Sequence, residues 1–305
     1  MKLSKIIFQL ILLGFLISPI AFAQSNTFVS NGGKLHYEIF GKGEPILIIN
    51  GGPGMNSNGF GELAMELGKK YQAIIYDQRG TGKSTLEEIN SNTVTMDLMV
   101  KDIEALRIHL KIEKWTLLGH SFGGILGYYY ASKHPERVKA MIQSSSGGMD
   151  LALLSLIDIQ SKLTDMEWDS LQYYGNKINE GDTSYGTLLK RGEFMAPAYL
   201  YNREFIPVLA KRMTQGNMQL NALVWSDLRR INYDTKESLQ SFEQPVLILH
   251  GKNDLLESSV AETAHNVLPN SQLELMDKCA HYGWLDRPDV YFDLIYDFMD
   301  SVKNL

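Results

Sequence analysis

A serine lies between two glycines in the segment GHSFG (119–123), directly after the apolar run 115–119. This spacing is the G-x-S-x-G pattern, in which a sharp turn from a strand into a helix exposes the serine hydroxyl. Glycines are needed on both sides, because a larger side chain would collide with the neighbouring strand or helix. The segment predicts a nucleophile at Ser121, with the N–H of Phe122 at a helix N-terminus as an oxyanion donor.

The serine needs two partners. A serine hydroxyl attacks a carbonyl only when a base removes its proton and an acid orients that base. After a G-x-S-x-G turn of this kind, the acid and then a histidine follow the serine along the chain. Asp254 follows the apolar run 245–250, and His281 follows the run 272–277, so both are expected in loops after strands. We therefore predict a triad of Ser121, Asp254 and His281.

A second glycine-rich segment, NGGPGMNSNG (50–59), follows another apolar run, 45–50. Its glycines allow the backbone to approach a substrate oxygen closely, and Pro53 fixes the turn. The N–H of Gly52 is the predicted second donor of the oxyanion hole, beside that of Phe122.

Short apolar runs alternate with longer stretches of helical periodicity over most of the chain. Repeated strand-then-helix order predicts a parallel sheet that is covered by helices on both faces. An Asn31-Gly32 turn within 28–40 predicts an early antiparallel hairpin. The strands are predicted at 45–50, 73–77, 115–119, 139–145, 245–250 and 272–277, and the helices at about 95–110, 122–133, 258–267 and 288–303.

The stretch 148–242 shows no strand pattern and is rich in aromatic residues and methionine. It is predicted to be a helical cap inserted into a core made of 24–147 and 243–305. We expect most of its aromatic side chains to form the interior of the cap and a few to face the cleft beneath.

The composition is that of a globular protein. The 305 residues are 44% hydrophobic and 21% charged, with a net charge of −6 and no basic stripe, so no nucleic-acid partner is expected. The only cysteine, Cys279, cannot form an internal disulfide. The predicted chemistry requires no cofactor or metal, and the expected partner is a small molecule or short peptide.

The N-terminal segment 1–23 has the pattern of a signal peptide. Lys2 and Lys5 precede the apolar run 6–17, and Ala-Phe-Ala at 21–23 offers a cleavage site. The pattern predicts export to the periplasm or the exterior, with no stable membrane partner after cleavage. The alternative is an uncleaved N-terminal membrane anchor.

Two further motifs, NGGPG (50–54) and DQRGTGKS (77–84), accompany the serine turn. Together they resemble the α/β-hydrolase superfamily and, within it, the prolyl iminopeptidase-like serine aminopeptidases. The family's first motif begins with histidine where this chain has Asn50, whereas the octapeptide matches in full. The resemblance covers about 28–147 and 243–303. It implies an α/β-hydrolase fold, a mostly parallel twisted sheet with helices on both faces and an inserted cap, and a buttressing role for the octapeptide loop.

The chain departs from this family where aminopeptidases hold the free α-amine of their substrate. These enzymes use acidic residues, and one commonly follows the catalytic aspartate directly. That position is Leu255, and the cap stretch 215–225, which aligns with a second acidic position, contains no Asp or Glu. Glu257, Glu193 and Glu204 are, in this order, the candidate replacements.

Three functions are consistent with these residues. The resemblance favours a serine aminopeptidase that releases N-terminal residues from small peptides. The absent acidic residues favour the same machinery acting on esters, as a carboxylesterase or lactonase for small apolar acyl groups. A non-catalytic binding protein with a hydrolase fold is the third alternative, and the complete set of predicted triad residues argues against it.

Overall fold

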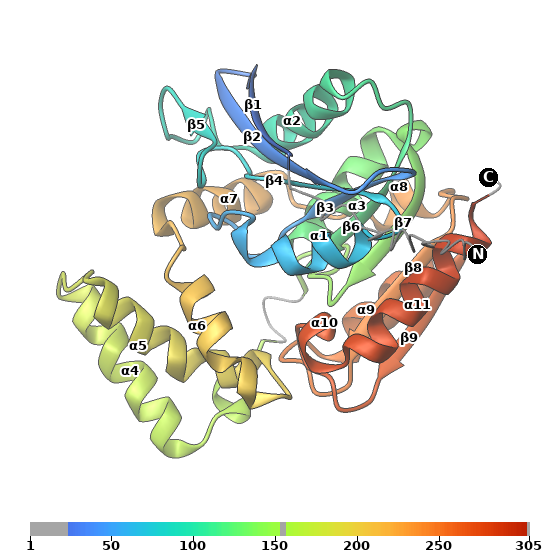
Figure 1. Cartoon of the computed structure of the whole chain (residues 1–305). Helices are drawn as coiled ribbons and strands as arrows, with labels where there is room; N and C mark the ends of the chain where they lie inside the picture. Colours follow the sequence, from blue (N-terminus) through green and yellow to red (C-terminus); the bar gives the residue numbers. More distant parts are fainter. Residues whose placement is uncertain (1–23, 153–156, 304–305) are drawn as a thin grey trace, which may run out of the picture.

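The computed structural model describes residues 24–152 and 157–303 (Figure 1). The predicted signal peptide, 1–23, lies outside the described residues. Within the described ranges, none of the helices combines the length and the apolar character needed to cross a membrane.

A nine-stranded sheet lies at the centre of the molecule, in the order β1-β2-β4-β3-β6-β7-β8-β9, with β5 paired to β2. The strands β4, β3, β6, β7, β8 and β9, in this spatial order, run parallel to their neighbours. Strand β2 is antiparallel to β1, β4 and β5. The mostly parallel sheet is therefore confirmed. The strands are β1 (Gln24–Ser30), β2 (Gly33–Phe40), β3 (Pro45–Ile49), β4 (Gln72–Tyr76), β5 (Thr85–Leu86), β6 (Trp115–His120), β7 (Val138–Ser144), β8 (Val246–Gly251) and β9 (Ser271–Met276).

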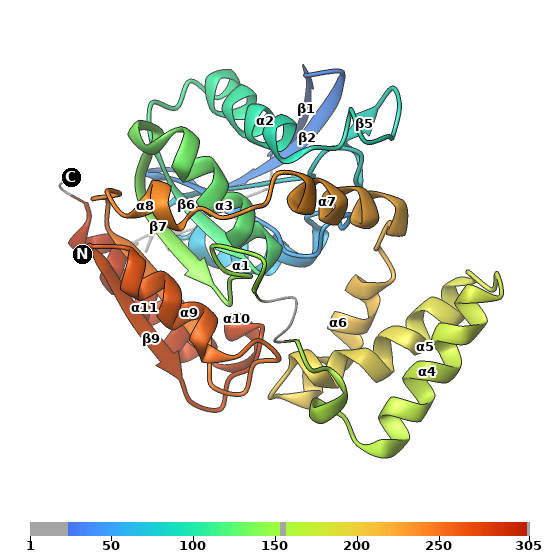
Figure 2. The same ribbon diagram turned by 180° about the vertical axis from the view of Figure 1, so that it is seen from behind.

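Figures 1 and 2 show the twisted sheet with helices on both of its sides. The sheet separates two hydrophobic cores. Alternate residues of β3 illustrate this: Leu47 packs in the core that contains α2, α3 and α9, and Ile48 packs in the core that contains α1 and α11. Strands that are buried on both faces consist of consecutive apolar residues, which explains why they could be recognised in the sequence. The helices of the two layers are α1 (Gly61–Leu67), α2 (Met96–His109), α3 (Phe122–Lys133), α9 (Ser258–Val267), α10 (Gly283–Asp286) and α11 (Pro288–Ser301).

The region between β7 and β8 contains five helices in the part that the structure describes: α4 (Asp165–Asn179), α5 (Tyr185–Met195), α6 (Ile206–Met213), α7 (Met218–Arg230) and α8 (Lys236–Leu239). Helices α4, α5 and α6 stand away from the sheet and form what we call the lobe (Figures 1 and 2). Helix α7 instead lies against the core, where Val224 and Leu228 are buried with residues of α2 and α3. Its Asp227 accepts a 2.8 Å hydrogen bond from the N–H of Met96, the first residue of α2.

Candidate active site

Ser121 occupies a strained turn between β6 and α3. Its backbone angles are φ 55° and ψ −122°, a conformation that residues with a Cβ rarely adopt. A Cβ atom at Gly119 would lie 2.6 Å from the carbonyl oxygen of Gly123, and one at Gly123 would overlap the carbonyl oxygen of Ile49 in β3. The two glycines therefore permit the close packing of β6, α3 and β3 that holds the serine in this turn.

Asp254 and His281 come together on the same side of the sheet. Nδ1 of His281 lies 2.9 and 3.0 Å from the two carboxylate oxygens of Asp254, and both side chains are buried. Burial alone would raise the pKa of Asp254, but the nearby His281 imidazole lowers it to about 2. An ionised carboxylate at this place keeps the proton on Nδ1, which leaves Nε2 free to accept another.

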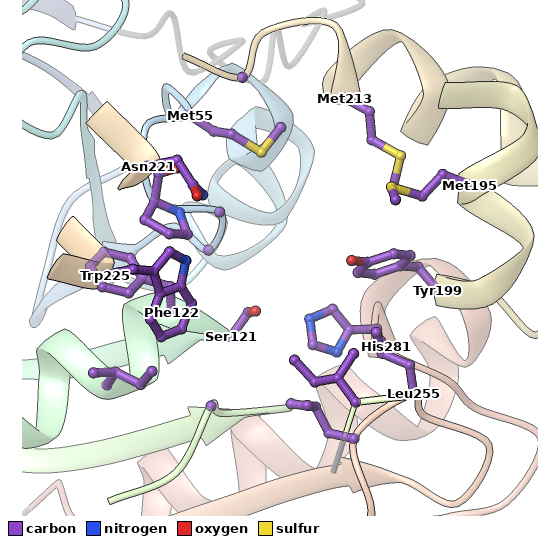
Figure 3. A pocket seen from close by; sticks show the side chains of 18 of the residues that line it. Met55, Ser121, Phe122, Met195, Tyr199, Met213, Asn221, Trp225, Leu255 and His281 are labelled. Atoms are coloured by element: carbon purple, nitrogen blue, oxygen red, sulfur yellow. The ribbon is translucent and has the colours of Figure 1, made fainter. Parts of the chain in front are cut away.

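Ser121 and His281 line one cavity, and Figure 3 shows the serine hydroxyl and the imidazole facing the same space. In the described structure the hydroxyl of Ser121 makes no hydrogen bond. Catalytic hydrogen bonds are often long without substrate and shorten when it binds. The three predicted triad residues thus converge on one site, although they are far apart in the sequence.

A wall of aromatic rings holds the imidazole of His281 in place. The His120 ring lies 4.8 Å from it, and the Tyr199 ring lies 5.4 Å from it. Burial keeps the pKa of His120 well below its usual range, so this histidine is neutral. Its Nδ1 donates to the carbonyl of Ser144 over 3.1 Å, and the residue therefore packs beside the site without being placed to act as the base.

The loop after β3 passes directly over the serine. A Cβ atom at Gly51 would lie 2.7 Å from Cβ of Ser121. Gly52 has a φ of 72°, and its N–H takes part in no backbone hydrogen bond of the described chain. Phe122 is the first residue of α3, so its N–H has no carbonyl partner within the helix. Both predicted oxyanion donors therefore lie in segments that adjoin Ser121.

The octapeptide loop 77–84 supports this segment, as the family resemblance implies. Gln78 donates a 2.9 Å hydrogen bond to the carbonyl of Asn50. The carboxylate of Asp77 accepts from the N–H and the hydroxyl of Ser57, at 2.9 and 2.8 Å. Asn50, which departs from the family motif, donates to the carbonyls of Gly51 and Met55 and so closes the loop locally.

Sequence reasoning missed a buried arginine that connects the lobe to this loop. Arg212 of α6 donates hydrogen bonds to the carbonyls of Gly51, at 3.0 Å, and Asn56, at 3.1 Å. Its guanidinium group lies 4.8 Å from the ring centroid of Phe60, and it forms no ion pair with a described carboxylate. The sequence carries no signal for this role, because it depends on how α6 docks against the core.

The loop after β3 (50–59), which contains Gly52, is called the oxyanion loop below. We expect Arg212→Met to lower kcat/KM by ~10- to 100-fold, because this loop loses two donors that fix its carbonyls. The free energy of unfolding should fall by about 1–3 kcal/mol, since buried carbonyl groups are left unpaired. Steady-state kinetics and urea unfolding measure the two effects. Lys211→Met, at the adjacent exposed position, is the matched control, and equal activities of the two variants would contradict the role of Arg212.

The cavity beside Ser121 and His281 has a volume of about 330 Å³ and is mostly apolar. Met55, Trp225 and Leu255 contribute to its walls, as Figure 3 shows. Apart from His281, the only ionisable side chain with a formal charge in this lining is Arg191. No Asp or Glu lines the described cavity, so its walls offer no counter-charge to an ammonium group.

The structure does not bring the three candidate glutamates to the cavity. Glu257 stands at the N-cap position of α9 without a side-chain capping hydrogen bond, and it is exposed, whereas Leu255 and Leu256 are buried and line the cavity. Glu193 pairs with Lys190 on α5 at 2.6 Å, and Glu204 is exposed. The expectation that one of them faces Ser121 is therefore not met by the described geometry.

The fold and the site define a family. The model of the alpha/beta hydrolase fold family matches residues 44–288, and the chain belongs to this family, in its prolyl iminopeptidase-like branch. A proline iminopeptidase of Lactobacillus delbrueckii subsp. bulgaricus is 30% identical over 280 residues, which cover 84% of this chain and 90% of the relative. A proline iminopeptidase of Lactobacillus helveticus (strain DPC 4571) is 28% identical over 285 residues, which cover 88% and 95%.

Solved structures share the fold. The structure of an alpha/beta fold family hydrolase from Bacillus anthracis str. Sterne superposes with a TM-score of 0.76 at 21% identity, covering 90% of this chain and 99% of that one. The resemblance stated from the motifs is thus confirmed, and the chain is an enzyme of a hydrolase family.

Proposed function

We propose that this enzyme is a serine hydrolase of small carboxylic esters. The observation that carries the proposal is the cavity beside Ser121, which offers Arg191 and no carboxylate among its described lining residues. A protonated α-amine that enters such a cavity loses hydration without gaining a counter-charge, which is costly. A neutral acyl group has no such penalty and fits the apolar walls.

In the proposed reaction the hydroxyl of Ser121 attacks the ester carbonyl while Nε2 of His281 accepts its proton. Asp254 stabilises the imidazolium that forms, and the N–H groups of Gly52 and Phe122 stabilise the oxyanion. The tetrahedral intermediate expels the alcohol, which takes the proton from His281. Water then attacks the acyl-enzyme with His281 as base, which releases the carboxylic acid and restores the serine.

An aminopeptidase of the prolyl iminopeptidase type is the second candidate. It is favoured by the two relatives described above, which are both named proline iminopeptidase and match 84% and 88% of this chain. In this case a carboxylate outside the described lining would have to reach the substrate amine.

Two isosteric substrates separate these candidates. The 4-nitrophenyl esters of cyclopentanecarboxylic acid and of L-proline share a leaving group and a ring size, and differ in one charged nitrogen. We expect kcat/KM for the cyclopentane ester to exceed that for the proline ester by ~10-fold or more, because the ammonium group is desolvated without a partner.

The Ser121→Ala variant supplies the background rate for both esters. A preference for the proline ester, together with cleavage of L-proline 4-nitroanilide, would favour the aminopeptidase. Rates that match the Ser121→Ala background for all these substrates would overturn both hydrolase proposals. As a further check, Leu255→Glu introduces a carboxylate into the lining and should shift the ratio towards the proline ester.

A further inference from the structure

A second cavity of about 630 Å³ adjoins the first and extends into the lobe. It lies mainly between residues of α4 and α5, including Trp168, Leu171 and Leu188. The two cavities have a shared boundary, whose members line both spaces: Ile157, Arg191, Met195, Met213, Gly216 and Met218. The two cavities therefore adjoin, and the shared boundary lies between the space beside Ser121 and the lobe.

Arg191 is the chemical exception on this boundary, since its other members are apolar residues and a glycine. Arg191 is half-buried, and no described side chain or carbonyl forms a hydrogen bond or ion pair with its guanidinium group. Asp158 is the one carboxylate residue in the described lining of the second cavity, and it accepts a hydrogen bond from the N–H of Ser161. On α5 and α4, Glu193 pairs with Lys190, and Glu167 pairs with Arg203. Arg191 is thus a cation in the wall of the reaction cavity for which the described residues supply no counter-ion.

The charge of Arg191 acts on Tyr199, which packs against His281. Burial raises the pKa of the Tyr199 hydroxyl, and the positive charge of Arg191 acts against this rise. Tyr199 in turn packs its ring against His281, with the ring centroids 5.4 Å apart. A group bound by Arg191 would therefore sit in the same enclosed space as the reacting atoms, beyond the immediate contacts of the ester.

We propose that Arg191 binds a carboxylate carried by the substrate at a distance from the scissile ester. The substrate class is then esters that bear one free carboxylate, and the inference rests on the esterase function proposed above. A guanidinium group binds a carboxylate through two parallel hydrogen bonds, and its half-buried place strengthens that pairing. A phosphate dianion fits less well, because the described lining offers one arginine for two charges.

The test uses monoethyl esters of the dicarboxylic acids from succinate to pimelate, each beside the matching ethyl ester with a carboxamide in place of the carboxylate. Butyrate esters of 3- and 4-hydroxybenzoate and their carboxamides cover a carboxylate on the leaving group. We expect one chain length or isomer to show a ratio of kcat/KM, carboxylate over carboxamide, of ~10 or more.

Variants on α5 assign this preference. Arg191→Gln should bring the ratio close to one, and Arg191→Lys should retain part of it, because it keeps the charge without the two-pronged geometry. Lys190→Gln is the matched control, since the adjacent lysine is exposed and paired with Glu193, and its ratio should equal that of the parent enzyme. Ratios near one in both series for the parent enzyme would overturn the inference and leave the esterase function standing.

Binding gives a readout that does not need turnover. Calorimetry with adipate should detect binding to Ser121→Ala and weaker binding, by ~10-fold or more, to the double variant that also carries Arg191→Gln. Equal affinity of the two variants, or no binding to either, would count against the carboxylate site. Arg191-dependent binding in an enzyme that cleaves no ester would uphold the site while the proposed reaction fails.

Discussion

Replacing Ser121 with alanine should lower kcat by at least ~10³-fold and leave the fold intact, because triad members act as one unit. Alanine keeps the Cβ atom, so the strain at φ 55° is unchanged. The serine hydroxyl makes no hydrogen bond in the described structure, so no buried partner is orphaned. Ester hydrolysis under saturating substrate measures kcat, and circular dichroism with thermal unfolding checks the fold.

Ser146→Ala is the control for this variant. Ser146 is a buried serine beside the turn, where its hydroxyl would contact a side chain placed at Gly124. We expect its kcat to stay within about threefold of the parent, since it does not line the cavity. A folded Ser121→Ala variant within tenfold of the parent would remove Ser121 from the mechanism, above all if Ser146→Ala were the inactive variant.

Asp254→Asn should lower kcat by ~10³- to 10⁴-fold. The amide presents an N–H to Nδ1 of His281, which favours the wrong tautomer, and it cannot stabilise the imidazolium. Asp277→Asn is the matched control, because Asp277 also follows a strand but is exposed and pairs with Lys252 at 2.9 Å. Its kcat should be unchanged, and equal losses in the two variants would contradict the assignment of the acid.

The depressed pKa of Asp254 adds a pH signature to the same pair of variants. A carboxyl group whose pKa is lower in the folded than in the unfolded state stabilises the fold above its unfolded pKa. That contribution is lost as the pH falls from about 4 towards the folded value of about 2. The parent enzyme should therefore lose stability over this window more steeply than Asp254→Asn does in acid titrations of the unfolding midpoint.

The sheet was largely predictable. Both ends of each of the six predicted parallel strands lie within one residue of the observed ends. Five of these strands are almost wholly buried and appear as apolar runs, whereas the edge strand β9 is partly exposed. The hairpin is also confirmed, with positive φ at Asn31 and Gly32. Strand β5, with two residues, gave no signal, because so short a segment has no periodicity.

The helices between β7 and β8 were predicted only as a group. Their amphipathic patterns show that one face of each is buried but do not show against what. Helix α7 packs on the core, whereas α4 and α5 pack on each other in the lobe. That difference arises from tertiary docking, which periodicity does not encode.

Residues in the loops after predicted strands could be expected to lie close together, because the carboxyl ends of parallel strands meet at one edge of the sheet. This holds for Ser121, Asp254 and His281. Arg191 and Arg212 could not be assigned, since their roles depend on the position of the lobe. The prediction that a glutamate faces Ser121 was wrong for a related reason. Glu257 is close to Asp254 in sequence, but its side chain is exposed to solvent.

The two hydrogen bonds from Arg212 couple the position of α6 in the lobe to the conformation of the oxyanion loop. Both bonds end on backbone carbonyls of the loop, and the carbonyl of Gly51 belongs to the same peptide plane as the N–H of Gly52. A rotation of α6 that breaks these bonds therefore also releases the plane that orients this N–H group. Contacts that a substrate makes in the lobe, far from the reacting bond, can therefore stabilise the loop conformation that orients the Gly52 N–H at the reaction centre. A substrate too short to reach the lobe forgoes that contribution and should react with a lower kcat, not only with a higher KM.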